Sequence, residues 1–268
     1  MGSVSGAPGP SDAWSTLAGL AVETSRIRLG TLVTSATFRL PGPLAVAVAG
    51  IDEMSGGRVE LGIGAGWYEA EHAAYGVPFP PTGERFDRLE EQLAIITGLW
   101  ETPDGEKFSY DGRYYQVADS PGLPKPAQRP RPPVIVGGHG PRRTPALAAR
   151  FASEFNVAFS PADVVVAQFG RVREACAAAG RDADSLTYSA AHTVCCGKDE
   201  ATLSRRAAAI GRDLADLRVN GITGSPAEIV DKIGELAEIG TQTLYLQILD
   251  LADLDHLADI AGGVLPQV

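Results

Sequence analysis

The sequence predicts an α/β fold with a parallel sheet, because apolar strand-length segments alternate with helix-length segments along the chain. The alternation gives six strands, centred near residues 28, 61, 135, 156, 190 and 246. The length of 268 residues is close to the roughly 250 residues of an α/β barrel, which has eight strands. We therefore expect a single α/β domain over residues 1–268, with fewer strands than a closed barrel.

Capping residues and helix breakers mark the helix boundaries. Ser11 or Asp12 caps the first helix, Ser55-Gly56-Gly57 ends the second, and Ser225-Pro226-Ala227-Glu228 forms a capping box. In one amphipathic helix, large apolar side chains from Phe86 to Trp100 recur at helical spacing. These patterns predict helices over residues 13–24, 44–54, 84–100, 145–152, 162–179, 200–217, 225–239 and 254–261.

The segments between the helices predict strands and loops. Apolar, β-branched runs predict strands over residues 26–34, 58–63, 134–136, 154–159, 186–196 and 243–249. Residues 1–11 are rich in Gly, Ser and Pro and predict a loop. Residues 101–132 differ in composition from the rest of the chain: an Asp-Gly turn lies between two aromatic runs and is followed by a proline-rich stretch. We interpret residues 101–132 as an insertion that contains a hairpin and covers one end of the domain.

Composition and charge narrow the classes of partner. Apolar residues make up 44% and charged residues 21% of the chain, as in ordinary globular proteins. The net charge of −10 argues against nucleic acid or an anionic membrane as the main partner. The longest apolar run, residues 44–51, is too short to span a bilayer. We therefore expect a cytoplasmic protein that binds small molecules.

Three cysteines form no disulfide framework, and their odd number suits a reducing cytosol. Cys195 and Cys196 are adjacent and would suit a redox pair, but their apolar strand favours small core residues instead. No second cluster of cysteines or histidines accompanies them, so we expect no metal site.

The stretch from Pro132 to Pro145 carries the clearest functional pattern. The buried strand Val134–Val136 runs into Gly137, Gly138 and Gly140, which let bare backbone N–H groups approach a ligand. Thr144 is predicted as the N-cap of the next helix, with Pro145 at its first position.

Two arginines, Arg142 and Arg143, add positive charge where the helix dipole is also positive. This combination predicts an anion site that suits a phosphate. The alternative is a tight strand-to-helix turn with two solvated arginines. Both interpretations fit this stretch taken alone.

Three phrases in order resemble the luciferase-like monooxygenase superfamily: IRLGTLVT at residues 27–34, GRVELGIGAGW at 57–67 and PVIVGG at 133–138. TGERFDRL at residues 82–89 and FNV at 155–157 resemble the branch of coenzyme F420-dependent oxidoreductases. The resemblance extends from about Asp12 to the C-terminus. It implies a TIM-type (β/α)8 barrel with a flavin or deazaflavin at the C-terminal ends of the strands.

The resemblance also implies where this cofactor binds. A non-proline cis peptide is expected near the cofactor ring within residues 32–35, which makes Val33 and Thr34 candidate contacts. The turn after the next strand, at Gly64, Ala65 and Gly66, is expected to approach the cofactor as well. The phosphate would be held by the loop after the strand at residue 135, through Gly137, Gly138, His139, Gly140, Arg142, Arg143 and Thr144.

The chain departs from the family pattern at its start. Its first strand resembles the third strand of the family's barrel, so the first two strands of that barrel have no counterpart in this chain. The stretch containing Asp and His that follows the second strand in relatives has no counterpart here either. Either the start codon is assigned too late, which we favour, or the chain is a truncated and partner-dependent form.

Few residues remain as candidates for acid–base chemistry. Glu69 and His72 follow the Gly64–Gly66 turn and are the catalytic candidates. Glu69 would equally be a helix-start carboxylate favoured by the helix dipole. His192 and His139 are further histidines to consider, although His192 also fits a satisfied core position.

Three functions stay open. The first is an F420-dependent oxidoreductase that transfers a hydride to or from a small organic substrate, with the protein orienting the cofactor. The second is an FMN-dependent monooxygenase supplied with reduced flavin by a separate reductase. The third is a non-catalytic, cofactor-binding homologue. The family resemblance also makes a homodimer an option.

Overall fold

The computed structural model describes residues 11–268 and divides into two compact units, Met1–Val136 and Gly137–Val268. The predicted loop at residues 1–11 lies almost entirely outside the described residues. The first unit contains helices α1 (Ala13–Glu23), α2 (Pro41–Ser55), α3 (Glu69–Ala74) and α4 (Thr82–Glu101). Its strands are β1 (Leu29–Gly30), β2 (Thr34–Ser35), β3 (Val59–Gly64), β4 (Phe108–Asp111) and β5 (Gln116–Ser120), and β6 (Val134–Gly137) leads out of it.

The sheet of the first unit is parallel and centred on β3. Strands β1 and β2 both pair with β3 on one edge, and β6 pairs with it through Val134 to Val136. The prediction of one strand over residues 26–34 is wrong. Gly30 is opposite Glu60 and Thr34 is opposite Ile63, so the β1–β2 segment holds one residue more than β3 and bulges at residues 31–33.

The helices of the first unit cover this sheet and begin close to their predicted positions. Asp12 caps α1 by accepting a hydrogen bond from the Ser15 N–H. Helix α2 begins at Pro41, three residues before the prediction at Leu44. The predicted Pro-Gly-Pro loop is instead its first turn, because a proline there leaves no intrahelical hydrogen bond unmade.

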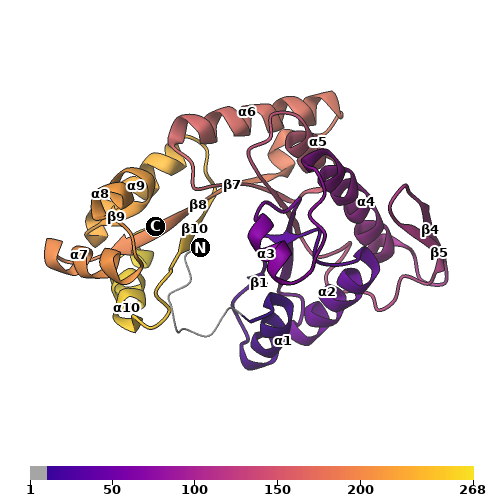
Figure 1. Ribbon diagram of the computed structural model, residues 1–268, viewed down its shortest axis with the longest axis horizontal. Coiled ribbons are helices and arrows are strands. Elements are labelled where there is room, and N and C mark those ends of the chain that lie inside the picture. The colour runs from indigo at the N-terminus through magenta and orange to yellow at the C-terminus, as the bar shows by residue number, and fades with distance from the viewer. Residues whose placement is uncertain (1–10) are drawn as a thin grey trace. The chain divides into compact units, whose positions relative to one another are not determined.

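The predicted insertion contains the expected hairpin. Strands β4 and β5 pair antiparallel around Asp111 and Gly112, and Figure 1 shows the hairpin projecting beside α4. The Glu91 carboxylate of α4 accepts hydrogen bonds from the backbone N–H groups of residues 113–115. The hairpin is therefore fastened to the first unit by a side chain of the preceding helix.

The second unit contains helices α5 (Arg143–Phe151), α6 (Ala162–Ala178), α7 (Glu200–Ala209), α8 (Leu214–Asn220), α9 (Pro226–Glu238) and α10 (Leu254–Gly263). Its strands are β7 (Glu154–Ala158), β8 (Thr187–Cys196), β9 (Ile222–Gly224) and β10 (Thr243–Gln247). Short 3-10 helices lie at Ala183–Ser185 and Leu265–Gln267. The six predicted strands thus correspond to β1, β3, β6, β7, β8 and β10.

Strand β8 is the centre of the second unit's sheet, with β7 and β10 parallel to it. The unpredicted β9 continues beyond β7 along the same edge of β8. Phe159, just after β7, donates its N–H to the Ala191 carbonyl, and Gly197 donates to the Gly224 carbonyl of β9. Backbone N–H and C=O groups along a strand point alternately to its two edges, and residues 191 and 197 are an even number apart. Both therefore point to the same edge of β8, on which β7 and β9 lie. A strand of three residues leaves too little pattern to read from sequence.

Two helix predictions in the second unit need correction. The predicted helix over residues 200–217 is two helices, because Gly211, with φ at +65°, ends the first and Asp213 caps the second. Helix α5 begins at Arg143 with Arg142 as its N-cap, so Thr144 is not the predicted cap. Pro145 still lies in the first turn, where its missing N–H costs nothing. The predicted capping box at Ser225 and Glu228 is confirmed.

Parallel strands with covering helices in each unit confirm the α/β prediction. Across residues 11–268, none of the helices has the length and apolar character needed to cross a bilayer. Within the same residues, His, Cys, Asp and Glu side chains form no group suited to a metal ion.

Candidate functional site

The loop after β6 has the backbone geometry expected of a glycine-dependent turn. Gly138 has a φ of +141°, a conformation that side-chain-bearing residues rarely adopt, and its N–H donates to the Asn156 carbonyl of β7 at 3.3 Å. Gly137 and Gly140 are half-buried. A glycine is therefore required at position 138 for the chain to leave the strand and enter α5.

Polar side chains of the second unit fasten this loop. The Gln168 amide of α6 donates to the His139 carbonyl at 2.7 Å. His139 Nε2 donates to the Ala158 carbonyl at 2.9 Å and lies 2.8 Å from Ser160 Oγ. His139 is thus held at both its backbone and its side chain, and its imidazole binds the end of β7.

The start of α5 concentrates positive charge. Its N-cap residue, Arg142, is exposed and makes no side-chain capping hydrogen bond. Arg143 is half-buried, and Thr144 is buried against Gly138. Five other helices begin with an Asp or Ser cap whose side chain accepts a hydrogen bond from the first turn: α1, α7, α8, α9 and α10. Unlike an Asp or Ser cap, an arginine cannot accept a hydrogen bond from the first turn, so the start of α5 is better suited than the starts of those helices to bind an external anion.

Phe159 lies directly after β7, beside the residues that hold the loop. Its φ is +51° although it is not a glycine, and 54% of its surface is exposed. Its N–H donates to the Ala191 carbonyl at 2.7 Å, and the carbonyl before it accepts from Ser160 Oγ. Hydrogen bonds before and after Phe159 therefore hold its backbone in a conformation that non-glycine residues disfavour, with the aromatic ring exposed to solvent.

The first unit carries the expected non-proline cis peptide, between Leu32 and Val33. Val33 is 41% exposed. The Thr34 hydroxyl accepts a hydrogen bond from the Trp14 indole at 3.1 Å, so Thr34 ties this segment to α1. Ala65 is half-buried.

The glycines of β3 and its following turn lie against the segment 31–37. A Cβ on Gly62 would lie 1.8 Å from the Thr31 carbonyl oxygen, and one on Gly66 would lie 2.4 Å from Ser35 Oγ. A Cβ on Gly64 would be 3.0 Å from a Val33 methyl. These glycines therefore allow two protein segments to pack closely, which explains them without a ligand. Their expected approach to a cofactor stays a prediction.

The two catalytic candidates differ in exposure. Glu69 is exposed at the first position of α3, where the helix dipole favours a carboxylate. His72 is 1% exposed, and both ring nitrogens are hydrogen-bonded, Nδ1 to the Tyr68 carbonyl and Nε2 to Thr37 Oγ1. His72 can act on a ligand only through a neighbour, whereas Glu69 can reach one directly.

The remaining candidates lie in the core of the second unit. His192 of β8 is 7% exposed, and its Nε2 has no hydrogen-bond partner within residues 11–268, so it does not fit the alternative of a fully satisfied core histidine. Burial lowers the pKa of His192. Cys195 and Cys196 are free and buried, as the core interpretation requires, and burial raises the pKa of Cys196 to about 11.

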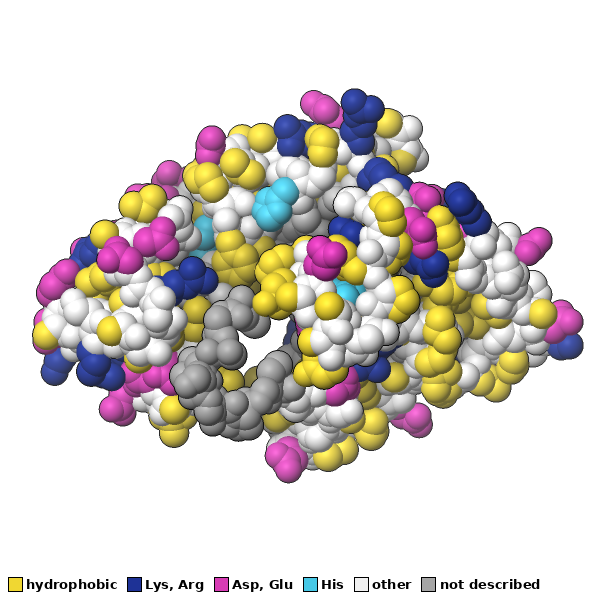
Figure 2. Space-filling view, in the orientation of Figure 1, with side chains coloured by type: hydrophobic (Ala, Val, Ile, Leu, Met, Phe, Trp, Pro, Cys, Tyr) yellow, Lys and Arg dark blue, Asp and Glu magenta, His cyan; other side chains and the backbone are white. Residues whose placement is uncertain are grey.

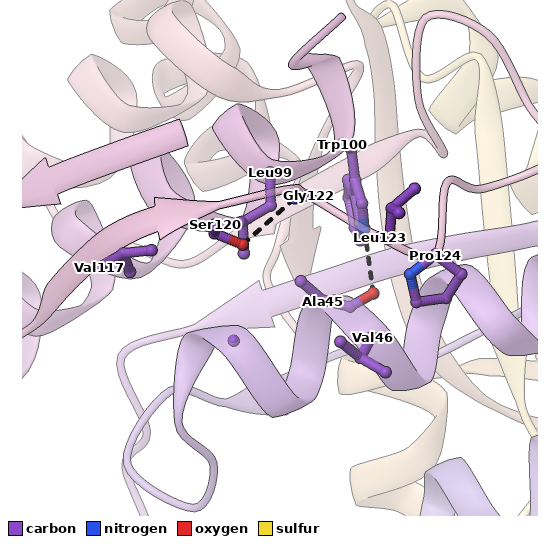
Figure 3. A pocket seen from close by; sticks show the side chains of 10 residues that line it. Ala45, Val46, Leu99, Trp100, Val117, Ser120, Gly122, Leu123 and Pro124 are labelled. Atoms are coloured by element: carbon purple, nitrogen blue, oxygen red, sulfur yellow. Dashed lines mark hydrogen bonds between the residues drawn. The ribbon is translucent and has the colours of Figure 1, made fainter. Parts of the chain in front are cut away.

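An apolar groove in the first unit is lined by none of the candidate residues. Figure 3 shows Ala45 and Val46 of α2 facing Trp100 of α4, with Leu123 and Pro124 beside them. The Trp100 indole donates to the Ala45 carbonyl at 3.0 Å. The volume of this groove, about 130 Å³, is well below the several hundred Å³ of typical cofactor pockets.

Charged side chains are mixed over the surface. On the face shown in Figure 2, dark-blue Lys and Arg alternate with magenta Asp and Glu over the helices, without a continuous basic band. The expectation from net charge that a nucleic-acid backbone is not the main partner stays a prediction.

Comparison with known proteins identifies the family. The profile of the luciferase-like monooxygenase family matches residues 1–218. The chain belongs to this family. One relative, the F420-dependent glucose-6-phosphate dehydrogenase of Microbacterium testaceum (strain StLB037), is 39% identical over 141 residues, which are 52% of this chain and 40% of that relative.

Another relative uses a different cofactor. The FMNH(2)-dependent dimethylsulfone monooxygenase of Pseudomonas putida is 32% identical over 146 residues, 53% of this chain and 39% of the relative. The matches to these two relatives span about two fifths of each relative's length. Luciferase-like relatives thus include both F420- and FMN-dependent enzymes.

A solved structure shows the same fold. An F420-dependent secondary alcohol dehydrogenase in complex with an F420-acetone adduct matches with a TM-score of 0.84 and 16% identity, covering 96% of this chain and 84% of that one. The expected fold class, the TIM-barrel type of luciferase-like proteins, is therefore confirmed.

Sequence reasoning missed several residues that organise these regions. Gln168 interrupts the apolar stripe of α6 formed by Val165, Phe169 and Val172, and a polar residue in such a stripe is a readable signal. Thr37 and the unusual backbone of Phe159 carry no comparable signal in the sequence.

Proposed function

We propose that this protein is an oxidoreductase that binds coenzyme F420 and transfers a hydride to or from a small organic substrate. The observation that carries the proposal is the loop from Gly137 to Thr144. A glycine at φ +141°, an arginine at the N-cap of α5 and a backbone fastened by Gln168 together suit a phosphate group. Similarity to an F420-dependent dehydrogenase supports F420 as the cofactor.

The residues present fit such a cofactor. When bound, a deazaflavin supplies the hydride-accepting and hydride-donating chemistry. The chain's own contribution is to bind and orient it: backbone N–H groups and Arg142 at the loop would neutralise the phosphate, and Arg143 would add to the local positive charge. Val33, beside the cis peptide, and the turn at Gly64–Gly66 are proposed as further contacts.

Glu69 is the proposed acid–base residue. It is an exposed carboxylate that follows the C-terminal end of β3, and α3 begins at this residue. In α/β folds the ends of parallel strands are the usual place for reacting groups. Glu69 would hold or accept a substrate proton during hydride transfer. Replacement Glu69→Gln is expected to lower turnover without loss of cofactor affinity.

FMN-dependent monooxygenation is the second candidate, favoured by the 32% identity to an FMNH(2)-dependent enzyme. It would require a separate reductase to supply reduced flavin. A homodimer is a proposal for either function. A chain that binds a cofactor without turnover is the remaining alternative.

Titration of the purified protein with F420 and with FMN, followed by absorbance and fluorescence, tests the proposal. We expect saturable binding of F420 that is tighter than binding of FMN. Tighter binding of FMN would favour the monooxygenase, and binding of neither would contradict both enzymatic functions. Binding without turnover in the presence of reductant and substrate candidates would favour the non-catalytic alternative.

A further inference from the structure

A chain of hydrogen bonds runs through the first unit from the Tyr68 backbone carbonyl to the hydroxyl of Ser35, a half-buried residue. His72 Nδ1 lies 2.7 Å from the Tyr68 carbonyl oxygen, and His72 Nε2 lies 2.6 Å from Thr37 Oγ1. Thr37 Oγ1 in turn lies 2.6 Å from Ser35 Oγ. Side chains from α3 (His72), from β2 (Ser35) and from the segment after β2 (Thr37) are thereby linked in series.

The Tyr68 carbonyl sets the direction of every hydrogen bond in this chain. A carbonyl oxygen only accepts, so His72 Nδ1 is the donor to Tyr68. Nε2 of a neutral imidazole is then an acceptor and takes the hydrogen of Thr37. The Thr37 oxygen consequently accepts the hydrogen of Ser35. Because a serine hydroxyl has one hydrogen, Ser35 has only lone pairs left to offer to a ligand.

The surroundings keep this arrangement fixed. His72 is 1% exposed, and the rings of Phe38 and Phe79 lie 4.7 Å and 4.5 Å from its centroid. Burying an imidazole in apolar surroundings is tolerated when both of its nitrogens are hydrogen-bonded, as they are here. Gly66 leaves room for the Ser35 hydroxyl, since a Cβ at position 66 would lie 2.4 Å from it.

Ser35 is also placed to meet a ligand. It is partly exposed, lies in β2 opposite Gly64, and follows the Leu32–Val33 cis peptide by two residues. We propose that His72 is a positioning residue which, through Thr37, holds the Ser35 hydroxyl as a hydrogen-bond acceptor for an N–H or O–H group of the bound cofactor or substrate. This inference rests on the proposed function, because it places a ligand beside Ser35.

Paired variants of Thr37 test the inference. Thr37→Val keeps the shape of the side chain but removes both hydrogen bonds, which frees the Ser35 hydrogen. We expect it to weaken binding of F420, or of FMN if that is the cofactor, by about three- to tenfold. Thr37→Ser should restore the affinity. The matched control is Thr97→Val, which removes a buried threonine hydroxyl from α4, where it donates to the Leu93 carbonyl.

A double-variant cycle separates positioning from mere structural support. If Thr37 acts through Ser35, the variant Ser35→Ala with Thr37→Val should bind no more weakly than Ser35→Ala alone. Effects of the two substitutions that add fully would overturn the inference. The thermal unfolding midpoint of each variant, measured alongside, shows whether affinity is lost without loss of fold.

The tautomer of His72 provides a readout that needs no cofactor. The chain has four histidines, which makes assignment of their ring ¹⁵N resonances practicable. We expect His72 to carry its hydrogen on Nδ1, and a neutral ring protonated on Nε2 would overturn the inference. Wild-type protein that binds neither cofactor would overturn the proposed function and the ligand role of Ser35 with it. Wild-type binding with Thr37→Val equal to Thr37→Ser would overturn the positioning role alone.

Discussion

The side-chain amide of Gln168 donates a 2.7 Å hydrogen bond to the backbone carbonyl of His139, so a helix core position holds the loop that follows β6. Gln168 is 2% exposed and its Oε1 has no partner within residues 11–268. Burying an amide with only one of its two polar ends hydrogen-bonded costs free energy, so such a residue in a helix core calls for a structural explanation. Its position here fixes the backbone of the candidate phosphate loop.

Replacement Gln168→Met removes the amide and keeps a side chain of similar length. We expect faster hydrogen exchange of the backbone amides at residues 137–142 and about three- to tenfold weaker cofactor binding, the effect of one lost hydrogen bond. Gln116→Met in the hairpin is the matched control, because the exposed Gln116 amide also donates to a backbone carbonyl, that of Gly112, at 2.7 Å. Unchanged exchange in Gln168→Met would contradict the tethering role.

Gly138 is expected to tolerate no side chain. Its φ of +141° lies in a region open essentially to glycine, and Gly138→Ala should cost about 1–3 kcal/mol of folding free energy. The cofactor affinity should fall as well if the loop distorts. Gly50→Ala in α2 is the control: a Cβ there meets nothing within 4 Å, and stability should rise by roughly 0.5–1 kcal/mol. Denaturant unfolding of the two variants measures both signs, and equal effects would contradict this account.

The strain at Phe159 predicts an unusual ranking of two truncations. Phe159→Gly and Phe159→Ala remove the same ring, but only glycine relaxes a φ of +51°. We expect the glycine variant to be more stable than the alanine variant by about 1–2 kcal/mol in denaturant unfolding. The reverse ranking, which holds at ordinary positions, would show that Phe159 is not strained.

The sequence predicts most of the architecture because the periodic segments are long. The capping box at Ser225, the hairpin turn at Gly112 and the buried strand from Val134 each follow from local chemistry. What it misses depends on contacts between distant residues. The bulge in residues 31–33 lies where that segment packs closely against Gly62, and no sequence pattern within residues 26–34 predicts it.

The candidate site divides in the same way. The roles of the glycines and arginines of the loop can be predicted from sequence, because backbone freedom and charge are intrinsic to these residue types. Pro145 after Thr144 predicts Thr144 as a helix cap, yet α5 begins one residue earlier, at Arg143, with Arg142 as its N-cap. The burial of His72 and its link to Ser35 also require knowledge of which segments meet, which one sequence does not contain.

Asp253 predicts a pH dependence of stability in the second unit. It caps α10, and its carboxylate accepts hydrogen bonds from the buried Arg206, which holds its pKa at about 2. Because the native pKa is below the usual 3.8, the interaction stabilises the fold above about pH 4 and is lost as the pH falls towards 2.

Asp253→Asn should therefore be less stable than wild type at pH 7, by about 1.5–3 kcal/mol for hydrogen bonds to a charged group. The difference should shrink as the pH is lowered from about 4 to 2, since wild-type Asp253 becomes increasingly protonated as the pH approaches its native pKa. Urea unfolding at several pH values checks this. A difference that stays constant over that range would contradict the assigned ion pair with Arg206.

Binding of a phosphate group by the loop from Gly137 to Thr144 can be tested with ligands that do and do not carry a phosphate. Affinities would be compared for FMN against riboflavin, and for F420 against its phosphate-free deazaflavin chromophore. The variant Arg142→Ala with Arg143→Ala removes the two loop charges. Its control, Arg171→Ala with Arg212→Ala, makes the same change of net charge at exposed residues of the second unit.

The decisive measurement is the ratio of affinities for the phosphorylated and phosphate-free ligand, determined by fluorescence titration of wild type and both double variants. We predict that wild type and the control prefer the phosphorylated ligand by roughly ten- to a hundredfold, as expected for charge-assisted hydrogen bonds. In Arg142→Ala with Arg143→Ala this preference should largely disappear, with binding of the phosphate-free ligand unchanged. A preference retained in full by that variant would contradict the account.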